Sequence, residues 1–216
     1  MAAAGWRVDR LWGRDDDPIH ASRGVDLVLI ATPDPVVRVV SDRIEPTPDT
    51  VVGHLAGSLG LDVLNIHARR TSVHPLLALP GGDLGAERLS SGGWFAVAGD
   101  PIHREVVASL GGRSFEVSDA HRVRYHAAAA VASNHLVALL GQVERMAAAI
   151  DVPFEAYLDL VQATIDNVIA LGPRAALTGP AARGDDETVA RHLEAIDPAD
   201  RPAYEALMGE ARRLAR

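Results

Sequence analysis

The sequence predicts an α/β domain followed by an all-α helical domain. Apolar runs of strand length alternate with stretches of helix length in the first half of the chain. The most complete run, residues 25–32, is apolar at nearly every position, which is typical of a strand that helices cover on both faces. Residues 119–150 contain no proline, which favours one long helix. We therefore expect a boundary near Ser118, with residues 1–118 and 119–216 as the two domains.

The first domain is expected to alternate strands and helices. Asp34 is a suitable N-cap and Pro35 a suitable first helical residue for the helix that follows the apolar run. Short connections join strand, helix and strand, so we expect a parallel sheet. The expected strands are residues 8–12, 25–32, 50–55, 94–99 and 114–117, and the expected helices are 34–44 and 101–110.

The second domain is expected to contain helices only. Asp119 is the expected N-cap of the long helix, and Asp151 that of the next one. A polar loop, residues 177–185, precedes two shorter helices. The expected helices are 119–150, 153–171, 186–196 and 199–214.

The first eight residues predict the end of a helix, a Gly5 cap and entry into a strand. In a dinucleotide-binding domain this junction follows a first strand and a G-x-G-x-x-G turn, so we expect both upstream of Met1. That strand is central in such a sheet, and its loss would leave a gap in the hydrogen-bond ladder. A late start, a truncated chain and an unusual neighbouring segment all fit this pattern, and we favour a late start.

Composition excludes several classes of function. The net charge of −8, without a basic stripe, argues against nucleic acid as a partner. The chain has no cysteine, and all 21 basic residues are arginine, so thiolate and lysine Schiff-base chemistry are excluded. Acidic runs lack the spacing of a metal site, and we expect no metal. The longest apolar stretch is too short to cross a membrane, and we expect a cytoplasmic protein.

Five motifs together resemble a known family: Ile30–Asp34, His54–Gly60, Ser72–Leu76, Tyr125–Asn134 and Leu177–Asp185. The family comprises bacterial proteins that pair a Rossmann-like domain with a helical domain of unknown function, within the 6-phosphogluconate dehydrogenase-like superfamily. It is similar to ketopantoate and pyrroline-5-carboxylate reductases. The resemblance implies an NAD(P)-dependent oxidoreductase that transfers hydride to a small 2-oxo acid or imine-like substrate, with ketopantoate as one candidate. The alternative is a non-catalytic, degenerate Rossmann module that senses a dinucleotide or mediates assembly.

Two segments are candidates for cofactor binding. Arg14 follows the first expected strand, where an arginine can pair with a 2′-phosphate, so we favour NADP over NAD. The alternative is a solvated turn in which residues 15–17 compete for the guanidinium. Ala31, Thr32, Pro33 and Asp34 end the apolar strand at the edge of the sheet that lines the ligand crevice. They are equally compatible with a simple strand-to-helix connection.

Four residues are candidates for substrate binding. His54 and Ser58 flank Gly57 after the next strand, again at the crevice, although His54 is equally compatible with a structural role. Thr178 and Arg183 lie in the polar loop, where Arg183 can hold a carboxylate. The alternative there is that Arg183 pairs with Asp185 and that Asp185 caps the next helix.

Three residues are candidates for catalysis. His74 is a possible proton donor or a loop histidine bonded to backbone. His126, Ala130 and Asn134 are spaced four residues apart on the long helix and share a face. The resemblance places a catalytic lysine at position 130 and the catalytic asparagine at Asn134. Because position 130 is alanine, we expect His126 to deliver the proton instead, unless these residues only pack between the domains.

The long helix also suggests a homodimer. Alanines at 127–130 and 147–149 permit close approach of helices, and the helix has more apolar surface than one small domain can cover. Relatives in the superfamily dimerise in this way. We therefore expect a homodimer that forms mainly through the helical domain.

Overall fold

The computed structural model describes residues 1–216 and divides into two compact units, Met1–Asn134 and His135–Arg216. The predicted fold class, an α/β domain followed by a helical region, is confirmed. Helix α4 (Asp119–Ala130) belongs to the first unit, because its side chains pack on the sheet. No helix has both the length and the apolar character needed to span a bilayer.

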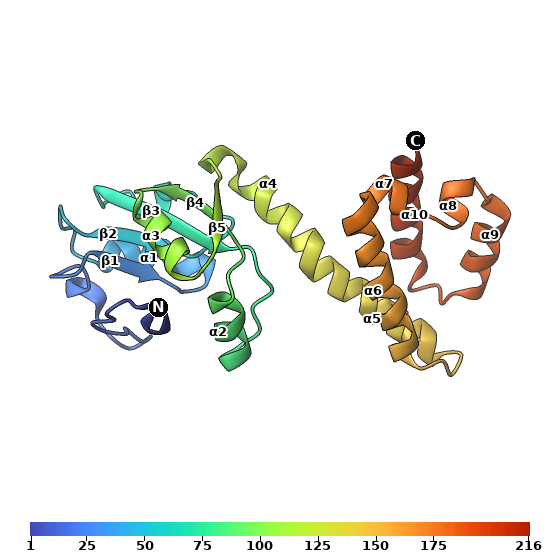
Figure 1. Ribbon diagram of the computed structural model, residues 1–216, viewed down its shortest axis with the longest axis horizontal. Coiled ribbons are helices and arrows are strands. Elements are labelled where there is room, and N and C mark those ends of the chain that lie inside the picture. The colour runs from blue at the N-terminus through green and yellow to red at the C-terminus, as the bar shows by residue number, and fades with distance from the viewer. The chain divides into compact units, whose positions relative to one another are not determined.

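The first unit is built on a five-stranded sheet with the order β1-β2-β3-β4-β5 (Figure 1). Strands β1, β2 and β3 are parallel, β4 is antiparallel to β3, and β5 is parallel to β4. The expectation of an all-parallel sheet is therefore wrong at β4. The chain between β3 and β4 returns without crossing the sheet, which reverses the strand direction. The strands are β1 (Leu27–Ile30), β2 (Val51–His54), β3 (Arg69–Pro75), β4 (Trp94–Gly99) and β5 (Arg113–Glu116).

Both faces of this sheet are covered, as expected for residues 25–32. Ile30 of β1 packs in a cluster with Val37 of helix α1, whereas Val73 and Phe95 pack in a second cluster with Val106 of helix α3. In the observed register these two sets of strand residues point to opposite faces. The other elements of the unit are the 3₁₀ turn Asp34–Val36, α1 (Val37–Arg43), the 3₁₀ helix Leu61–Leu64, α2 (Gly82–Ser90) and α3 (Ile102–Ser109).

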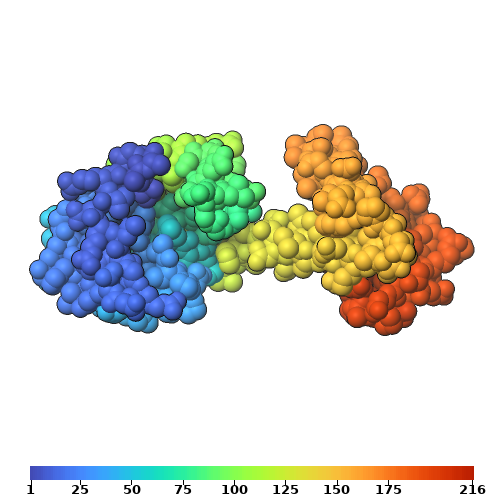
Figure 2. All heavy atoms as spheres, turned by 90° about the horizontal axis from the view of Figure 1, so that it is seen from below, coloured from blue at the N-terminus to red at the C-terminus, as the bar shows by residue number.

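The strand predicted at residues 8–12 is wrong. This segment has no regular structure and pairs with no strand, which leaves β1 at the edge of the sheet. The N-terminal residues, dark blue in Figure 2, instead lie on the surface of the first unit. A hollow of about 720 Å³ separates them from β1. A strand requires a neighbour with which to share backbone hydrogen bonds, and residues 8–12 have none.

The second unit is helical throughout. The predicted helix 119–150 begins in the first unit as α4, contains one π-helical turn, Val131–His135, and continues in the second unit as α5 (Leu136–Ala148). Gln142 and Arg145 of α5 bond to Asp200 and connect this helix to the C-terminal segment. The remaining helices are α6 (Phe154–Leu171), α7 (Pro173–Ala176), α8 (Pro180–Arg183), α9 (Asp186–Ala195) and α10 (Arg201–Ala215).

Three predicted helix caps are wrong. Neither Asp34, Asp119 nor Asp151 accepts a hydrogen bond from the first turn of its helix. The carboxylate of Asp34 instead accepts a hydrogen bond from Ser58, and that of Asp119 accepts one from the backbone of Leu61. Tertiary contacts have therefore replaced the local ones, and both carboxylates hold the loop that follows β2.

Candidate active site

A polar cluster lies where the parallel strands β1, β2 and β3 end. Because these strands run in the same direction, their carboxyl ends meet at one edge of the sheet. His54 of β2 is paired with Ser72 of β3, and His74 lies two residues further along on the same face. Helix α4 adds Arg122 and Tyr125 to this cluster.

His74 is the centre of the cluster. Its Nδ1 lies 2.6 Å from the hydroxyl of Tyr125, and the two rings meet edge to face. The ring centroid of His126 lies 5.8 Å from that of His74. Burial lowers the pKa of His74 to about 4, and the neighbouring charges of His126 and Arg122 act in the same direction. The imidazole is therefore neutral near pH 7, with Nδ1 committed to Tyr125.

Gly57 brings the loop after β2 against this pair of imidazoles. A Cβ at this position would lie 2.7 Å from Nε2 of His74 and 2.6 Å from Cδ2 of His126. Glycine is therefore required for the close approach. The second ring nitrogen of His74 consequently faces a loop in which half-buried Ser58 follows Gly57.

Hydrogen bonds hold this loop in place. Ser58 donates to Oδ2 of Asp34 over 2.7 Å, and the backbone N–H of Leu61 donates to Oδ2 of Asp119 over 3.0 Å. Nε2 of His54 lies 3.2 Å from the carbonyl oxygen of Gly60. These bonds tie the loop to the ends of β1 and β2 and to the first turn of α4.

His54 and Arg122 are the buried members of the cluster. His54 is fully buried, and burial lowers its pKa. Nε2 of His54 is within hydrogen-bond distance of the carbonyl oxygen of Gly60, whereas Nδ1 has no hydrogen-bond partner. The structural role considered for His54 therefore accounts for only one of its two ring nitrogens. Arg122 donates to Oγ of Ser72, and its exposed fraction is 1%.

Sequence reasoning missed Tyr125 and Arg122. Arg122 precedes His126 by four residues, a spacing that predicts a shared face on α4, whereas Tyr125 is adjacent to His126 and lies off that face. The spacing that linked His126 to Asn134 therefore extends to Arg122, but it does not reveal the contacts of Arg122 and Tyr125 with β3. An arginine in a helix is normally exposed, so its burial here was not expected.

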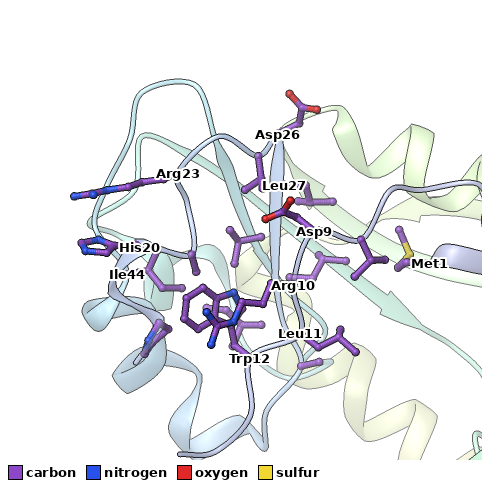
Figure 3. Close-up of a pocket in the computed structure, with 18 of the residues that line it drawn as sticks. Met1, Asp9, Arg10, Leu11, Trp12, His20, Arg23, Asp26, Leu27 and Ile44 are labelled. Atoms are coloured by element: carbon purple, nitrogen blue, oxygen red, sulfur yellow. The ribbon is translucent and has the colours of Figure 1, made fainter. Parts of the chain in front are cut away.

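One of the predicted cofactor residues carries a buried polar atom that lacks a hydrogen-bond partner. Oγ1 of Thr32, at the carboxyl end of β1, is buried and has no hydrogen bond. Ala31 and Thr32 line the 720 Å³ hollow together with Trp12, over which the guanidinium of Arg10 stacks at 4.0 Å. Figure 3 shows Arg10 and Trp12 side by side on the wall of this hollow. The unpaired hydroxyl of Thr32 can bond to a dinucleotide at the end of β1, whereas the hollow itself runs along the unpaired edge of this strand.

Arg14 is exposed in the turn that follows Trp12. It takes part in none of the ion pairs of the structure, because Asp16 pairs with Arg10 and Asp17 with Arg43. Of the acidic residues 15–17, which were expected to compete for the guanidinium of Arg14, Asp16 and Asp17 therefore pair with other arginines. Pro33 is exposed and precedes the 3₁₀ turn Asp34–Val36.

The remaining predicted residues lie outside the cluster. Asn134 is exposed within the π-helical turn, a rare feature that is frequent at functional sites. Thr178 and Arg183 are exposed on the second unit. Asp185 caps α9 by accepting a hydrogen bond from the backbone of Thr188, as the alternative for this loop expected, but it forms no ion pair with Arg183.

Acid is expected to destabilise the protein. His74 has a pKa of about 4 in the folded protein, against 6.5 as its ordinary value. As the pH falls below 6.5 the unfolded chain takes up the proton first, so the free energy of unfolding should decrease until the pH reaches about 4. Burial lowers the pKa of His54, His67 and His103 in the same direction. Urea unfolding at a series of pH values should show a smaller decrease in His74→Gln, and an identical decrease would contradict the shift.

Comparisons with known proteins agree with this architecture. Residues 96–211, more than half of the chain, match the family model described as Domain of unknown function (DUF2520). A Thermotoga maritima protein has a TM-score of 0.72 at 22% identity, covering 88% of this chain and 78% of its own. A candidate NADP oxidoreductase from Bacteroides fragilis has a TM-score of 0.70 at 20% identity, covering 87% and 75%.

A third structure, 1-pyrroline-5-carboxylate reductase from Streptococcus pyogenes, has a TM-score of 0.57 at 13% identity, covering 89% and 78%. A search of curated protein sequences gave no match. At these identities the structural likeness shows the fold, and the resemblance to Rossmann-like proteins with a helical domain of unknown function is confirmed.

Proposed function

The chain belongs to the family described as Domain of unknown function (DUF2520), and we propose that it is an NAD(P)-dependent oxidoreductase that reduces a small 2-oxo acid or imine-like substrate. Two structures that share its fold are described as an NADP oxidoreductase candidate and a pyrroline-5-carboxylate reductase, which supports this class of reaction. The single observation that carries the proposal is the hydrogen bond between His74 and Tyr125 at the carboxyl edge of the parallel strands.

Reduction of a carbonyl group requires a hydride and a proton, and the bound dinucleotide supplies the hydride. Neutral His74 has one N–H to offer, and the 2.6 Å bond to Tyr125 places it on Nε2 when the Tyr125 hydroxyl donates to Nδ1. This N–H donates to the substrate oxygen and gives up its proton as negative charge develops there. The Tyr125 proton moves to Nδ1 in the same step, so the imidazole stays neutral, and the phenolate left on Tyr125 takes a proton from solvent. His126, beside His74, is a second imidazole through which a proton from solvent can return to His74.

The other predicted residues keep separate roles in this proposal. Asn134 orients the substrate by hydrogen bond. Ala31–Asp34 hold the dinucleotide, with the free hydroxyl of Thr32 as one hydrogen-bonding group. Ketopantoate remains one candidate substrate.

NADPH oxidation by the purified protein, followed across a panel of 2-oxo acids and cyclic imines, tests the proposal. Turnover of at least one substrate is expected. Dinucleotide binding without turnover of any would favour the alternative, a non-catalytic module, which the absence of lysine at position 130 also favours.

Arg14→Ala is expected to weaken NADPH binding at least tenfold while leaving NADH binding nearly unchanged. A charge-assisted contact to the 2′-phosphate is worth about 1.5–3 kcal/mol, and NADH lacks that phosphate. Calorimetric titration of both dinucleotides measures the difference. Arg124→Ala, which removes another exposed arginine, is the control. An equal loss for both dinucleotides would contradict the assignment of Arg14.

We also propose a homodimer that forms through the helical unit. None of the residues of α6 is buried, although six large apolar side chains of this helix are exposed, Ile169 by 78% and Leu160 by 63%. So much exposed apolar surface on one helix is typical of an interface. Light scattering at micromolar concentration should give twice the chain mass of 22.9 kDa, and Ile169→Asp should reduce it to the mass of one chain. A monomeric mass for the unmodified protein would contradict the proposal.

A further inference from the structure

Arg122 is a buried cation that the proposed function does not yet use. Its exposed fraction is 1%, and Nη2 donates to Oγ of Ser72. Nε and Nη1 have no hydrogen-bond partner. Of the five N–H groups of a guanidinium, these two atoms carry three. A buried guanidinium with most of its donors unpaired is costly, and such an exception calls for an explanation.

Arg122 forms no ion pair with a carboxylate, and the charge of nearby Asp119 offsets only part of the effect of burial. Asp119, one turn earlier on α4, accepts from the backbone of Leu61. Burial lowers the pKa of Arg122, in accord with a cation that lacks a partner. Nδ1 of His54 also lacks a hydrogen-bond partner, and His54 is aligned with Ser72 in the register of β2 and β3. The unpaired atoms of His54 and Arg122 therefore lie on either side of Ser72, at the edge of the sheet where the candidate active site lies.

The loop after β2 runs past Arg122. Gly60 lies against Asp119, and Gly57 lies against His126. Positions 119, 122 and 126 are spaced three and four residues apart, so they share one face of α4 with Arg122 in the middle. The stretch of loop between Gly57 and Gly60 thus lies over the face of α4 that carries Arg122, so a ligand reaches the guanidinium only if this stretch moves.

We propose that Arg122 binds a small oxyanion, the carboxylate of the substrate, with Ser72 and His54 beside it. The proposal rests on the proposed function and names its substrate class as 2-oxo acids or cyclic imino acids. An oxyanion supplies the acceptors that Nε and Nη1 lack and turns an unpaired buried charge into charge-assisted hydrogen bonds. In a 2-oxo acid the carboxylate is bonded to the reacting carbon. One site must hold both groups, and Arg122 and His74 occupy the same edge of the sheet.

A phosphate of the dinucleotide is the other source of such an oxyanion. The residues suited to the dinucleotide lie at β1 and along the hollow beside it, whereas Arg122 lies over β3, next to the proton-donating pair. This separation favours the substrate carboxylate.

Calorimetric titration with sodium oxalate at constant ionic strength tests the proposal, with inorganic phosphate as the second probe. Oxalate is expected to bind the unmodified protein, and Arg122→Gln to weaken that binding tenfold or more. Arg124→Gln, two residues away on the same helix and exposed, should leave it unchanged. If Arg122→Gln does not fold, Arg122→Lys takes its place. It keeps the charge but loses the planar guanidinium, and a tenfold loss is again expected.

Three results would overturn the inference: no oxalate binding by the unmodified protein, equal binding by the Arg122 variant, or displacement of oxalate by inorganic phosphate and NADPH. These measurements need no turnover. Oxalate binding that depends on Arg122 without reduction of any 2-oxo acid would leave the anion site standing and reject the reductase. Reduction with an unchanged KM in the Arg122 variant would reject only the anion site.

Discussion

His74→Gln is expected to lower kcat for the reduction by about 10²–10⁴-fold, the usual contribution of a positioned proton donor. Glutamine can still donate a hydrogen bond, but it cannot give up a proton and receive another from Tyr125. Because His74 belongs to β3 and the candidate dinucleotide residues lie at β1, NADPH affinity should stay the same. Steady-state kinetics and calorimetric titration with NADPH measure the two quantities.

His67→Gln is the matched control for this change. His67 is also buried and also has a pKa that burial lowers, but its Nε2 meets the carbonyl oxygen of Ser41, outside the cluster. The control should retain its kcat. Similar loss in both variants would mean that His74 acts through the stability of the fold, and full turnover in His74→Gln would remove it from the chemistry.

Asn134→Ala and His126→Ala are each expected to lower kcat by about 10²-fold or more with little change in NADPH affinity. Asn134 would lose the amide that orients the substrate. His126 would lose the imidazole that lies 5.8 Å from His74 and returns the proton from solvent. Steady-state kinetics of both variants provide the measurement.

His121→Ala is the control on the same helix, because His121 is exposed and bonds only to Ser118. If Asn134→Ala and His126→Ala keep full turnover while His74→Gln does not, the chemistry depends on His74 and Tyr125 alone. If all of these variants keep full turnover, the cluster is not the active site.

Local rules predicted most of the elements but not all of their contacts. Four of the five expected strands are present, because strongly apolar runs such as residues 94–99 determine their own burial. Strand β3 was missed, because Arg69, Arg70 and Ser72 interrupt its apolar pattern although Thr71 and Val73 are buried. Ser72 and His74 contribute to the candidate site, whereas Arg69 forms an ion pair with Asp100.

The structure brings some of the predicted site residues together, and it adds residues that the sequence did not suggest. Strand ends placed Thr32, His54 and Ser58 at one edge of the sheet, as observed. Asp34 and Asp119 were assigned to helix caps, a local rule that their contacts with the loop after β2 override. Tyr125 and Arg122 acquire their meaning only from β3, 51 and 50 residues away in the sequence, and no local pattern carries that information.

Transfer of deuterium from labelled NADPH tests the central claim most directly. The protein is incubated with NADPH that carries deuterium at both C4 positions of the nicotinamide and with each member of the panel of 2-oxo acids and cyclic imines, and the products are analysed by mass spectrometry. Reduction at this site predicts one deuterium on the carbon of the former carbonyl or imine, and at least 10²-fold slower formation of that labelled product by His74→Gln under the same conditions. Unlabelled substrate recovered unchanged, although the dinucleotide is bound, would contradict the account and identify the protein as a non-catalytic module.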